Sequence, residues 1–387
     1  MRILRPTAVL AATLLLIAAC GSTGATEPAA SPESANTHAG HLAASAPPPT
    51  ALRDGERFVD LALSTAYTPK APNGGTDDYR CFLVDPGLTE EAYLTGSRFL
   101  PQNAAIVHHA IFYRLDPQQA QEAVKVDAST PGEGWTCFGD AGVEGQTAWV
   151  AHWAPGAGET MMPTGTGFAM PPGSKLVMQV HYNLLAEGTA GQTDQSGIQL
   201  RMANATTKLT SLSTALFLAP IELPCATGES GPLCDRDAAI KDVGSRFGAE
   251  AGEQEGQLVQ WCSGGTPKPG NTQHCDQQLE EGGTVYMAAG HMHLLGRSIK
   301  IELNPGKAGA TTILDQPQYD FDNQALVPLA KPITVKRGDT IRVTCTHDAT
   351  LRKKLPQLKT LPARYVVWGE GTSDEMCLGI LVVTPTA

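Results

Sequence analysis

The sequence lacks several motifs that define common classes of protein. It contains no CxxC pair, no G-x-S-x-G and no H-E-x-x-H. These absences leave zinc ribbons, thioredoxin-type redox sites, serine hydrolases and zinc proteases without support. No cluster of lysine and arginine stands out against a formal net charge of −11, so neither nucleic acid nor a polybasic membrane contact is expected.

Helical periodicity is also scarce, and short alternating segments recur in its place. The runs KLVMQVHYN, SIKIEL and CLGILVV are separated by stretches rich in glycine, proline, asparagine and aspartate, which is the pattern of an all-β protein. Roughly 335 residues follow the N-terminal region, more than one hydrophobic core usually serves. We therefore expect two domains, residues 53–205 and 206–387.

The first 52 residues predict export rather than a folded domain. Residues 1–20 have a basic end and an apolar run that is too short to span a bilayer and has the form of a secretory signal. The run ends in a sequence that resembles a bacterial lipobox, which implies lipid attachment at Cys20; an ordinary signal peptide cut nearby is the alternative. Residues 21–52 are expected to form a flexible tether. The chain would then be exported and held to the cell envelope, on its periplasmic or extracellular face, by the lipid anchor alone.

Eight cysteines remain beyond Cys20, an even number that favours four disulfides in an exported chain. Eight cysteines allow 105 pairings, and the sequence alone does not choose among them. Two pairs bracket Gly/Pro-rich turns, and the favoured set built on them is Cys81–Cys137, Cys225–Cys234, Cys262–Cys275 and Cys345–Cys377. Because a strand alternates faces, anchoring Cys377 on one side would direct Met376 to the other.

Histidines concentrate in these apolar, strand-like segments. His291 and His293 flank Met292 in the run TVYMAAGHMHLLGRSIKIEL, and on a strand residues i and i+2 share a face. A surface pair is the simplest interpretation of such a motif taken alone. The adjacent pair His108 and His109 and the single His181 lie in similar runs, where an unpaired imidazole would be unfavourable. The histidines are therefore candidate metal ligands.

The candidate ligands form two sets with different chemistry. The first set has three imidazoles, from His108, His109 and His181, whereas the second has two imidazoles and the thioether of Met376. A thioether is a soft donor that favours Cu(I) over zinc, calcium or magnesium, so the expected metal is copper. Neighbouring residues point to opposite faces of a regular strand, so His108 and His109 bind one ion only if a bulge intervenes or the two rings use different nitrogens.

These segments resemble the copper type II, ascorbate-dependent monooxygenases. The similar motifs are VHHAIFYRL, QVHYN, GHMHLLG and GTSDEMC, and with WAPG...GTGFAMPPGSKLVMQVHYN they span residues 80 to 382. The resemblance implies two tandem jelly-roll β-sandwich domains with one copper on each, facing a shared, solvent-filled cleft. It assigns the first set to an electron-storing copper. The second set, His291, His293 and Met376, would form the catalytic copper that binds O2.

The implied activity is insertion of one oxygen atom from O2 into a substrate C–H bond, with ascorbate or another one-electron donor reducing two coppers per chain. A different class, an exported copper-binding lipoprotein that buffers or relays copper, is the alternative. Among the remaining polar residues, Gln179 is either a group that supports His181 or an ordinary strand residue, and His152 is expected to be structural or to line the cleft.

The substrate is expected to be a small molecule and not a glycine-extended peptide. Where the peptidylglycine enzyme of this family holds its substrate carboxylate, this chain has Ala289, Leu378 and Ile380. A buried carboxylate without a partner costs several kcal/mol, so a neutral or cationic compound is favoured. Arg297 or Arg342 remains an alternative carboxylate partner. The protein is expected to be a monomer.

Overall fold

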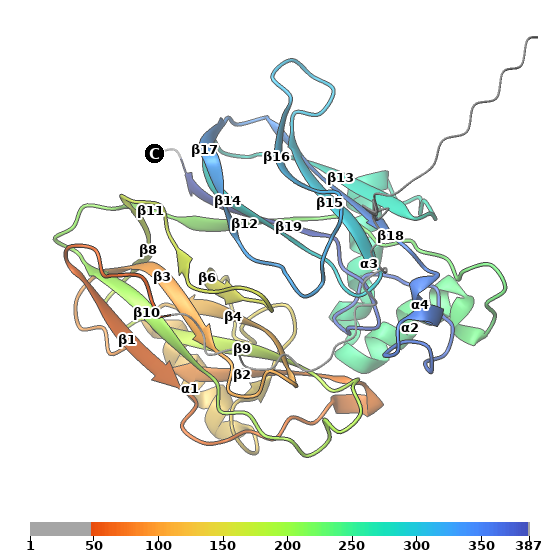
Figure 1. Cartoon of the computed structure of the whole chain (residues 1–387), viewed down its shortest axis with the longest axis horizontal. Helices are drawn as coiled ribbons and strands as arrows, with labels where there is room; N and C mark the ends of the chain where they lie inside the picture. The colour runs from red at the N-terminus through yellow and green to blue at the C-terminus, as the bar shows by residue number, and fades with distance from the viewer. Residues whose placement is uncertain (1–47, 386–387) are drawn as a thin grey trace, which may run out of the picture. The chain divides into compact units, whose positions relative to one another are not determined.

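The computed structural model describes residues 48–385 (Figure 1). The predicted signal peptide (1–20), the lipidation site Cys20 and all but the last residues of the tether (21–52) lie outside the described residues. In the described part of the chain, no helix combines the length and the apolar character needed to cross a membrane. The described chain is mostly β-structure, which confirms the all-β prediction.

The first half of the described chain forms two sheets. The larger has the strand order β1-β10-β3-β8-β11, with β7 paired to β3, and the other has the order β5-β2-β9-β4-β6. The strands of the larger sheet are β1 (Glu56–Ala62), β3 (Ala92–Leu100), β7 (Thr160–Met161), β8 (Thr166–Met170), β10 (Gly197–Asn204) and β11 (Thr210–Ser211). Those of the other sheet are β2 (Asp77–Val84), β4 (Val107–Leu115), β5 (Trp135–Thr136), β6 (Ala148–Trp153) and β9 (Lys175–Asn183).

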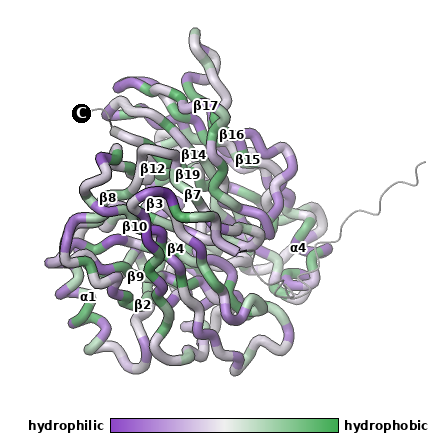
Figure 2. The backbone as a smooth tube through the Cα atoms, turned by 60° about the vertical axis from the view of Figure 1, so that its left-hand side comes forward, coloured by the Kyte–Doolittle hydropathy of each residue, from purple (hydrophilic) through white to green (hydrophobic). Residues whose placement is uncertain are grey.

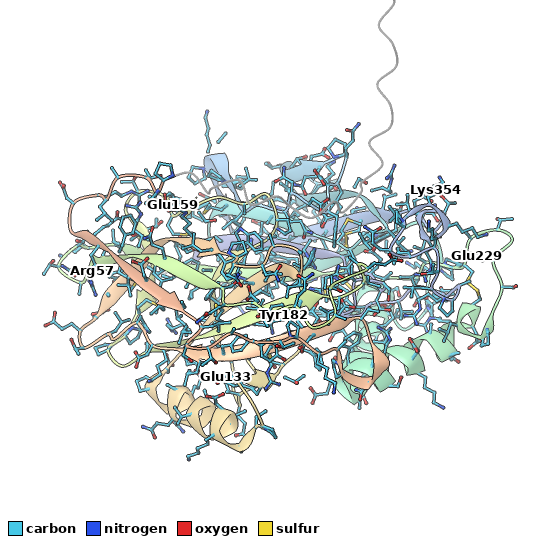
Figure 3. The ribbon with its side chains drawn as sticks, turned by 60° about the horizontal axis from the view of Figure 1, so that its bottom comes forward. Arg57, Glu133, Glu159, Tyr182, Glu229 and Lys354 are labelled. Carbon is cyan, nitrogen blue, oxygen red and sulfur yellow. A yellow bond between two sulfur atoms is a disulfide. The ribbon has the colours of Figure 1, made fainter. Side chains whose placement is uncertain are left out.

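Side-chain alternation along β9 shows how these two sheets pack and why the histidines lie outside their core. Met178 and Tyr182 belong to the hydrophobic core that the two sheets share, and Tyr182, labelled in Figure 3, is fully buried. Val177 belongs to a separate cluster on the opposite face, where helix α1 (Pro117–Ser129) also packs. Because successive side chains alternate, His181 lies on that second face rather than in the sandwich core.

The second half forms another pair of sheets, with strand orders β12-β19-β14-β17 and β13-β18-β15-β16. A separate core, which includes Ile301, Val343 and Leu381, joins them. The first sheet contains β12 (Ser213–Leu218), β14 (Gly283–His291), β17 (Val327–Val335) and β19 (Leu378–Pro385). The second contains β13 (Thr272–Gln278), β15 (Gly296–Leu303), β16 (Thr311–Gln316) and β18 (Thr340–His347). In Figure 2, hydrophobic and hydrophilic stretches are interspersed along the backbone, as expected for strands with one buried face.

The chain passes from the first pair of sheets to the second between β11 and β12. Although β11 follows the predicted boundary after residue 205, it still pairs with β8 of the first pair. Strand β12 begins at Ser213 and pairs with β19 of the second. The sheets thus form two sandwich-like pairs, each with its own main hydrophobic core, while the jelly-roll topology and the domain limits 53–205 and 206–387 remain predictions.

Two helices between β12 and β13 were not expected from the sequence. Helix α2 (Arg236–Phe247) and helix α3 (Ala249–Ser263) form a hairpin, although helical periodicity is scarce in the sequence. Val243 and Phe247, four residues apart, bury one face of α2 against Tyr365 and Val367. The helices approach closely at Gly244 and Gly252, where an added Cβ on Gly252 would lie 3.0 Å from the Gly244 Cα.

All four favoured disulfides are present: Cys81–Cys137, Cys225–Cys234, Cys262–Cys275 and Cys345–Cys377. One lies in the first half of the chain and three in the second. Cys262 belongs to helix α3 and Cys275 to β13, so this bond attaches the unexpected hairpin to the second pair of sheets. Disulfides suit an oxidising, exported environment.

Candidate metal centre

The first three histidines come from two neighbouring strands, β4 and β9. His109 lies directly opposite His181, and the strand register shifts between Val107 and His109, so that His108 occupies a β-bulge. The bulge turns two consecutive side chains toward the same region. The structure therefore supplies the bulge that this adjacent pair requires to act at a single site.

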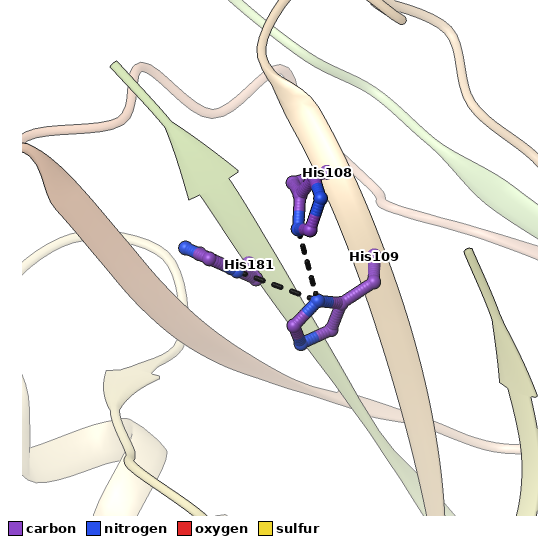
Figure 4. Close-up of side chains that lie close together, drawn as sticks. All are labelled: His108, His109 and His181. Atoms are coloured by element: carbon purple, nitrogen blue, oxygen red, sulfur yellow. Dashed lines mark hydrogen bonds between the residues drawn. The ribbon is translucent and has the colours of Figure 1, made fainter. Parts of the chain in front are cut away.

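The three imidazoles converge through their Nδ1 atoms (Figure 4). Nδ1 of His109 lies 3.1 Å from Nδ1 of His108 and 3.4 Å from Nδ1 of His181. Nitrogens that share one ion at about 2.0–2.1 Å are separated by similar distances. One ligand nitrogen from each ring lies within 4.8 Å of the other two, and all three residues are buried. This arrangement has the donor number and spacing of a three-histidine metal site.

Asp77 on β2 holds His181 in the orientation that the cluster requires. Nε2 of His181 lies 2.9 Å from Oδ1 of Asp77. A proton on Nε2 that is donated to this carboxylate leaves Nδ1 with a free lone pair, as in the carboxylate–histidine pairs that support metal ligands. Burial alone would raise the pKa of Asp77, but hydrogen bonds from His181, Thr372 and Thr76 outweigh it and keep the pKa below its usual value.

His109 is kept neutral. Burial, and then the nearby charges of His181, His108 and His291 in their protonated forms, lower its pKa well below the usual histidine value. A neutral imidazole offers a lone pair, which is the form that binds a metal ion.

The second pair of histidines is only partly on a strand. His291 is the last residue of β14, whereas His293 lies in the turn that leads to β15, so the prediction of two side chains on one strand face was wrong. The turn nevertheless brings the rings together, with centroids 5.2 Å apart and planes at 84°. Gly290, next to His291 on β14, packs closely against β15: an added Cβ would lie 2.5 Å from Cγ2 of Ile299.

These two rings present Nε2 rather than Nδ1. Nδ1 of His291 lies 2.5 Å from Oε1 of Gln324, and Nδ1 of His293 lies 3.3 Å from the carbonyl oxygen of Asp374. If each Nδ1 carries the proton, each Nε2 keeps its lone pair, and Nε2 of His293 is buried without a hydrogen-bond partner. Burial, then the charge of protonated His293, lowers the pKa of His291 to about 3. Both rings are therefore suited to donate through Nε2.

Glu375 fixes the methionine-bearing segment against this turn. Its fully buried carboxylate accepts hydrogen bonds from the backbone N–H of His293 at 2.9 Å and of Leu295 at 2.6 Å. The next residue, Met376, lines the same cavity as His291. Cys377 is bonded to Cys345 of β18, which agrees with the expectation that the disulfide directs Met376 to the opposite side.

The two ligand sets meet inside the protein. The ring centroids of His109 and His291 are 5.6 Å apart, closer than the resemblance implies for two sites that face each other across a solvent-filled cleft. Other contacts also join the halves here: Asp77 Oδ1 accepts from Oγ1 of Thr372 at 2.5 Å, Tyr79 Oη donates to the carbonyl of Glu370 at 2.8 Å, and Phe321 stacks on His108 at 4.4 Å.

One cavity of about 190 Å³ adjoins both sets. Its walls are largely apolar and aromatic, and they include His109, His291 and Met376 among the candidate ligands; the other main wall residues are Trp149, Trp153, Trp368, Leu216, Leu218, Leu378 and Ile380. His152 lines the cavity as expected, and so does Gln179, whose amide donates to the carbonyl of Asp140 at 2.7 Å rather than to His181.

The cavity has no cationic residue. Among residues 48–385, no lysine or arginine lines it. Arg342 instead pairs with Asp276 on strand β13, and Arg297 is exposed. The apolar Leu378 and Ile380, named above from the sequence, are in the wall.

A buried cluster of three imidazoles beside a second group of two imidazoles and a thioether is typical of a transition-metal protein. Residues 270–383 match the family model described as copper type II ascorbate-dependent monooxygenase, C-terminal domain. The chain is also 23% identical over 349 residues to the tyramine beta-hydroxylase of Caenorhabditis briggsae, a match that covers 86% of this chain and 50% of that relative. Both matches support the copper type II ascorbate-dependent monooxygenase family for this chain. It spans about half the length of the relative it matches.

Solved structures give no comparable support. The chain is 11% identical to allantoicase, over 81% of this chain and 90% of that one, with a TM-score of 0.18. For the coconut allergen cocosin the identity is 10%, over 85% of each chain, with a TM-score of 0.16. TM-scores this low carry no argument about fold or function.

Proposed function

We propose that the protein is a copper-dependent monooxygenase that inserts one oxygen atom from O2 into a C–H bond of a small molecule. The observation that carries the proposal is the pair of unlike donor sets at one cavity: three Nδ1 atoms in the first set, two Nε2 atoms and a thioether in the second. Their buried lone pairs and soft sulfur fit copper rather than a hard cation. His108, His109 and His181 would hold one copper, and His291, His293 and Met376 the catalytic one.

The residues of this chain divide the work of such a reaction. Bound copper supplies the one-electron chemistry and the activation of O2. Asp77 keeps Nδ1 of His181 unprotonated, and Gln324 and the Asp374 carbonyl do the same for Nε2 of His291 and His293. The apolar wall excludes water from the reacting region and holds the substrate beside Met376.

Access for the electron donor is available at the first set. A second cavity of about 180 Å³ lies against His108, on a part of the surface formed by residues such as Asn183, Leu185 and Gln192. Ascorbate or another one-electron donor could reach the three-histidine set there while the substrate occupies the first cavity. Separate entry routes suit an enzyme that must receive electrons and substrate independently.

The substrate is proposed to be neutral or cationic near the C–H bond attacked. The cavity offers no arginine or lysine for a carboxylate among the described residues, so glycine-extended peptide acids are not expected to be substrates. The relative named above is called tyramine beta-hydroxylase, which makes small aromatic compounds reasonable first candidates for assay.

We further propose that the protein is an exported, monomeric lipoprotein, attached to the envelope through Cys20. Labelling cells with an alkyne analogue of palmitate should tag the wild-type chain, and Cys20→Ala should release it in soluble form. Membrane attachment that persists in this variant would contradict the proposed anchor.

Copper buffering or relay without hydroxylation remains the alternative function. The soluble domain, reconstituted with copper, should consume O2 with ascorbate only when a substrate is present and should form hydroxylated product in proportion. Two bound coppers without coupled product formation over a panel of neutral and cationic aromatic compounds would favour the alternative.

A further inference from the structure

Helix α2 ends beside the segment that carries Met376. This segment, residues 369–376, lies outside the helices and strands that flank it, α4 (Leu351–Lys354) and β19. A segment without regular backbone pairing depends on side-chain contacts for its position. One group of these contacts comes from Arg246, in the last turn of α2.

Arg246 binds the carboxylate of Asp374 with both terminal nitrogens of its guanidinium group. Nη1 donates to Oδ2 at 2.8 Å and Nη2 donates to Oδ1 at 2.7 Å, and Asp374 is only 2% exposed. Arg364 adds a further bond to Oδ1 at 2.7 Å. A bidentate arginine fixes the plane of a carboxylate as well as its position, which a single contact does not. Arg246 therefore determines how the side chain of Asp374 is oriented.

Two glycines make room for this buried ion pair. An added Cβ on Gly369 would lie 2.9 Å from Cγ of Asp374. One on Gly371 would lie 2.8 Å from Oδ2 of Asp374 and 2.9 Å from Nη1 of Arg246. The backbone N–H of Gly371 also donates to Oδ2 of Asp374 at 3.2 Å. The segment is thus folded around the ion pair, so a shift of the pair would shift the segment.

Asp374 is connected to two ligands of the second set. Its carbonyl oxygen lies 3.3 Å from Nδ1 of His293, and this contact leaves Nε2 of His293 available to a metal. The following residue, Glu375, accepts from the backbone N–H of His293, and the next residue is Met376. A displacement of Asp374 would therefore alter both the His293 ring and the position of the thioether.

The helix that supplies Arg246 is itself held from several sides. Nε of Arg246 donates to Oδ2 of Asp242, one turn earlier on α2, at 2.9 Å. The backbone carbonyl of Arg246 accepts from Nδ2 of Asn73, in the first half of the chain, at 3.0 Å. The Cys262–Cys275 disulfide attaches the hairpin to β13. The hairpin thus has the anchoring that a support for a metal site requires.

Resting on the function proposed above, we propose that Arg246 is a positioning residue of the second copper site, which acts through Asp374 to hold His293 and Met376 in place. The hairpin of α2 and α3 then has a defined task, which is to carry this arginine to the segment of the thioether. Contacts of this kind around metal ligands control affinity although they do not touch the ion.

Copper binding by the reduced protein tests this proposal without relying on turnover. The variants are Arg246→Gln, in which Arg364 still neutralises Asp374, and Asp374→Asn, which keeps the shape of the side chain. Their combination completes a double-mutant cycle. Arg236→Gln is the matched control, because Arg236 also lies on α2 and forms a similar buried ion pair, with Glu222, that involves none of the candidate ligands. Competition with a Cu(I) chelator gives the affinities, X-ray absorption gives the Cu–S contact, and denaturant unfolding gives the stability.

Arg246→Gln and Asp374→Asn should each weaken one of the two coppers about 10- to 100-fold and reduce the Cu–S signal per copper. The double variant should bind copper no more weakly than the weaker single variant, because both changes remove the same interaction. Arg236→Gln should also lower the midpoint of unfolding, yet it should keep both copper affinities and the Cu–S signal.

Unchanged copper affinities and Cu–S signal in Arg246→Gln would overturn the proposal, and so would an equal loss in Arg236→Gln, because the ion pair would then serve stability alone. If Arg246→Gln does not fold, Asp374→Asn decides by the same two measurements. A wild-type protein without a Cu–S signal would also overturn the proposal. Absence of hydroxylated product while these copper results hold would instead count against the monooxygenase function alone.

Discussion

The two ligand sets differ in how the chain makes their donors available. In the first set, a β-bulge and a strand pairing bring three Nδ1 atoms together. The carboxylate of Asp77 fixes the His181 ring through a hydrogen bond to its other nitrogen, Nε2. In the second, a turn and a disulfide-anchored segment present two Nε2 atoms and a thioether. Three similar donors suit an ion that only stores an electron, whereas a soft sulfur stabilises the reduced state that meets O2. Under the proposed function, the same fold thus builds two copper sites of unlike chemistry.

The largest effect is expected from removal of the thioether. Met376→His should keep two coppers but lose most turnover, by at least about 100-fold, because a harder donor stabilises the oxidised ion. Steady-state product formation and copper analysis on the same preparation measure both quantities. Met292→Leu is the matched control. Met292 lies between His291 and His293 in the sequence, its side chain is completely buried, and Leu is a volume-conserving replacement. Near-normal turnover in Met376→His would contradict the special role assigned to the thioether in the second ligand set.

A smaller effect is expected from the disulfide beside the thioether. Replacing both Cys345 and Cys377 by serine should destabilise the protein by about 3 kcal/mol, since this bond closes a loop of intermediate length. It should also reduce turnover more than copper content, because Met376 loses its anchor. Denaturant unfolding and copper analysis separate the two effects. The corresponding change at Cys81 and Cys137 should destabilise the chain without altering the Cu–S contact of the reduced protein; loss of that contact would contradict the different roles assigned to these bonds.

The smallest of these effects is expected at Asp77. Asp77→Asn should weaken one of the two coppers about 10- to 100-fold and leave the other unchanged, because a carboxylate that orients a ligand histidine contributes about that much. Competition with a copper chelator gives the two affinities. Asp78→Asn is the control, since Asp78 accepts from Tyr67 and from the backbone of Lys70 and makes no bond to His181. Equal weakening of both coppers would show that Asp77 acts on the two sets together through Thr372.

The histidines that the structure brings together could be identified from the sequence more easily than the residues around them. His108, His109 and His181 were identifiable because imidazoles in apolar strand segments are rare, and the need for a bulge followed from strand geometry alone. Asp77, Gln324 and Glu375 were missed because each forms its hydrogen bond to a histidine residue from a segment that is distant in the sequence. The DD and DE pairs that contain Asp77 and Glu375 have no local signal that distinguishes them from surface acids.

Two further features could not be predicted for physical reasons. Helices α2 and α3 contain three glycines, which disfavour a helix, and their stability comes from the packing of Val243 and Phe247 on the segment around Tyr365. The contact of His109 with His291 depends on how the two halves pack, which Thr372, Tyr79 and Phe321 determine through contacts between halves. Neither property is encoded in a single motif.

X-ray absorption of the reduced protein, combined with copper analysis of His181→Ala, tests most directly whether two unlike copper sites exist. The wild type should bind two coppers per chain and show a Cu–S contact from Met376. His181→Ala should bind about one copper and retain the Cu–S contact, with the sulfur signal per copper increased because the sulfur-free site is empty. Loss of both coppers, loss of neither, or a reduced wild-type protein without Cu–S would contradict the account.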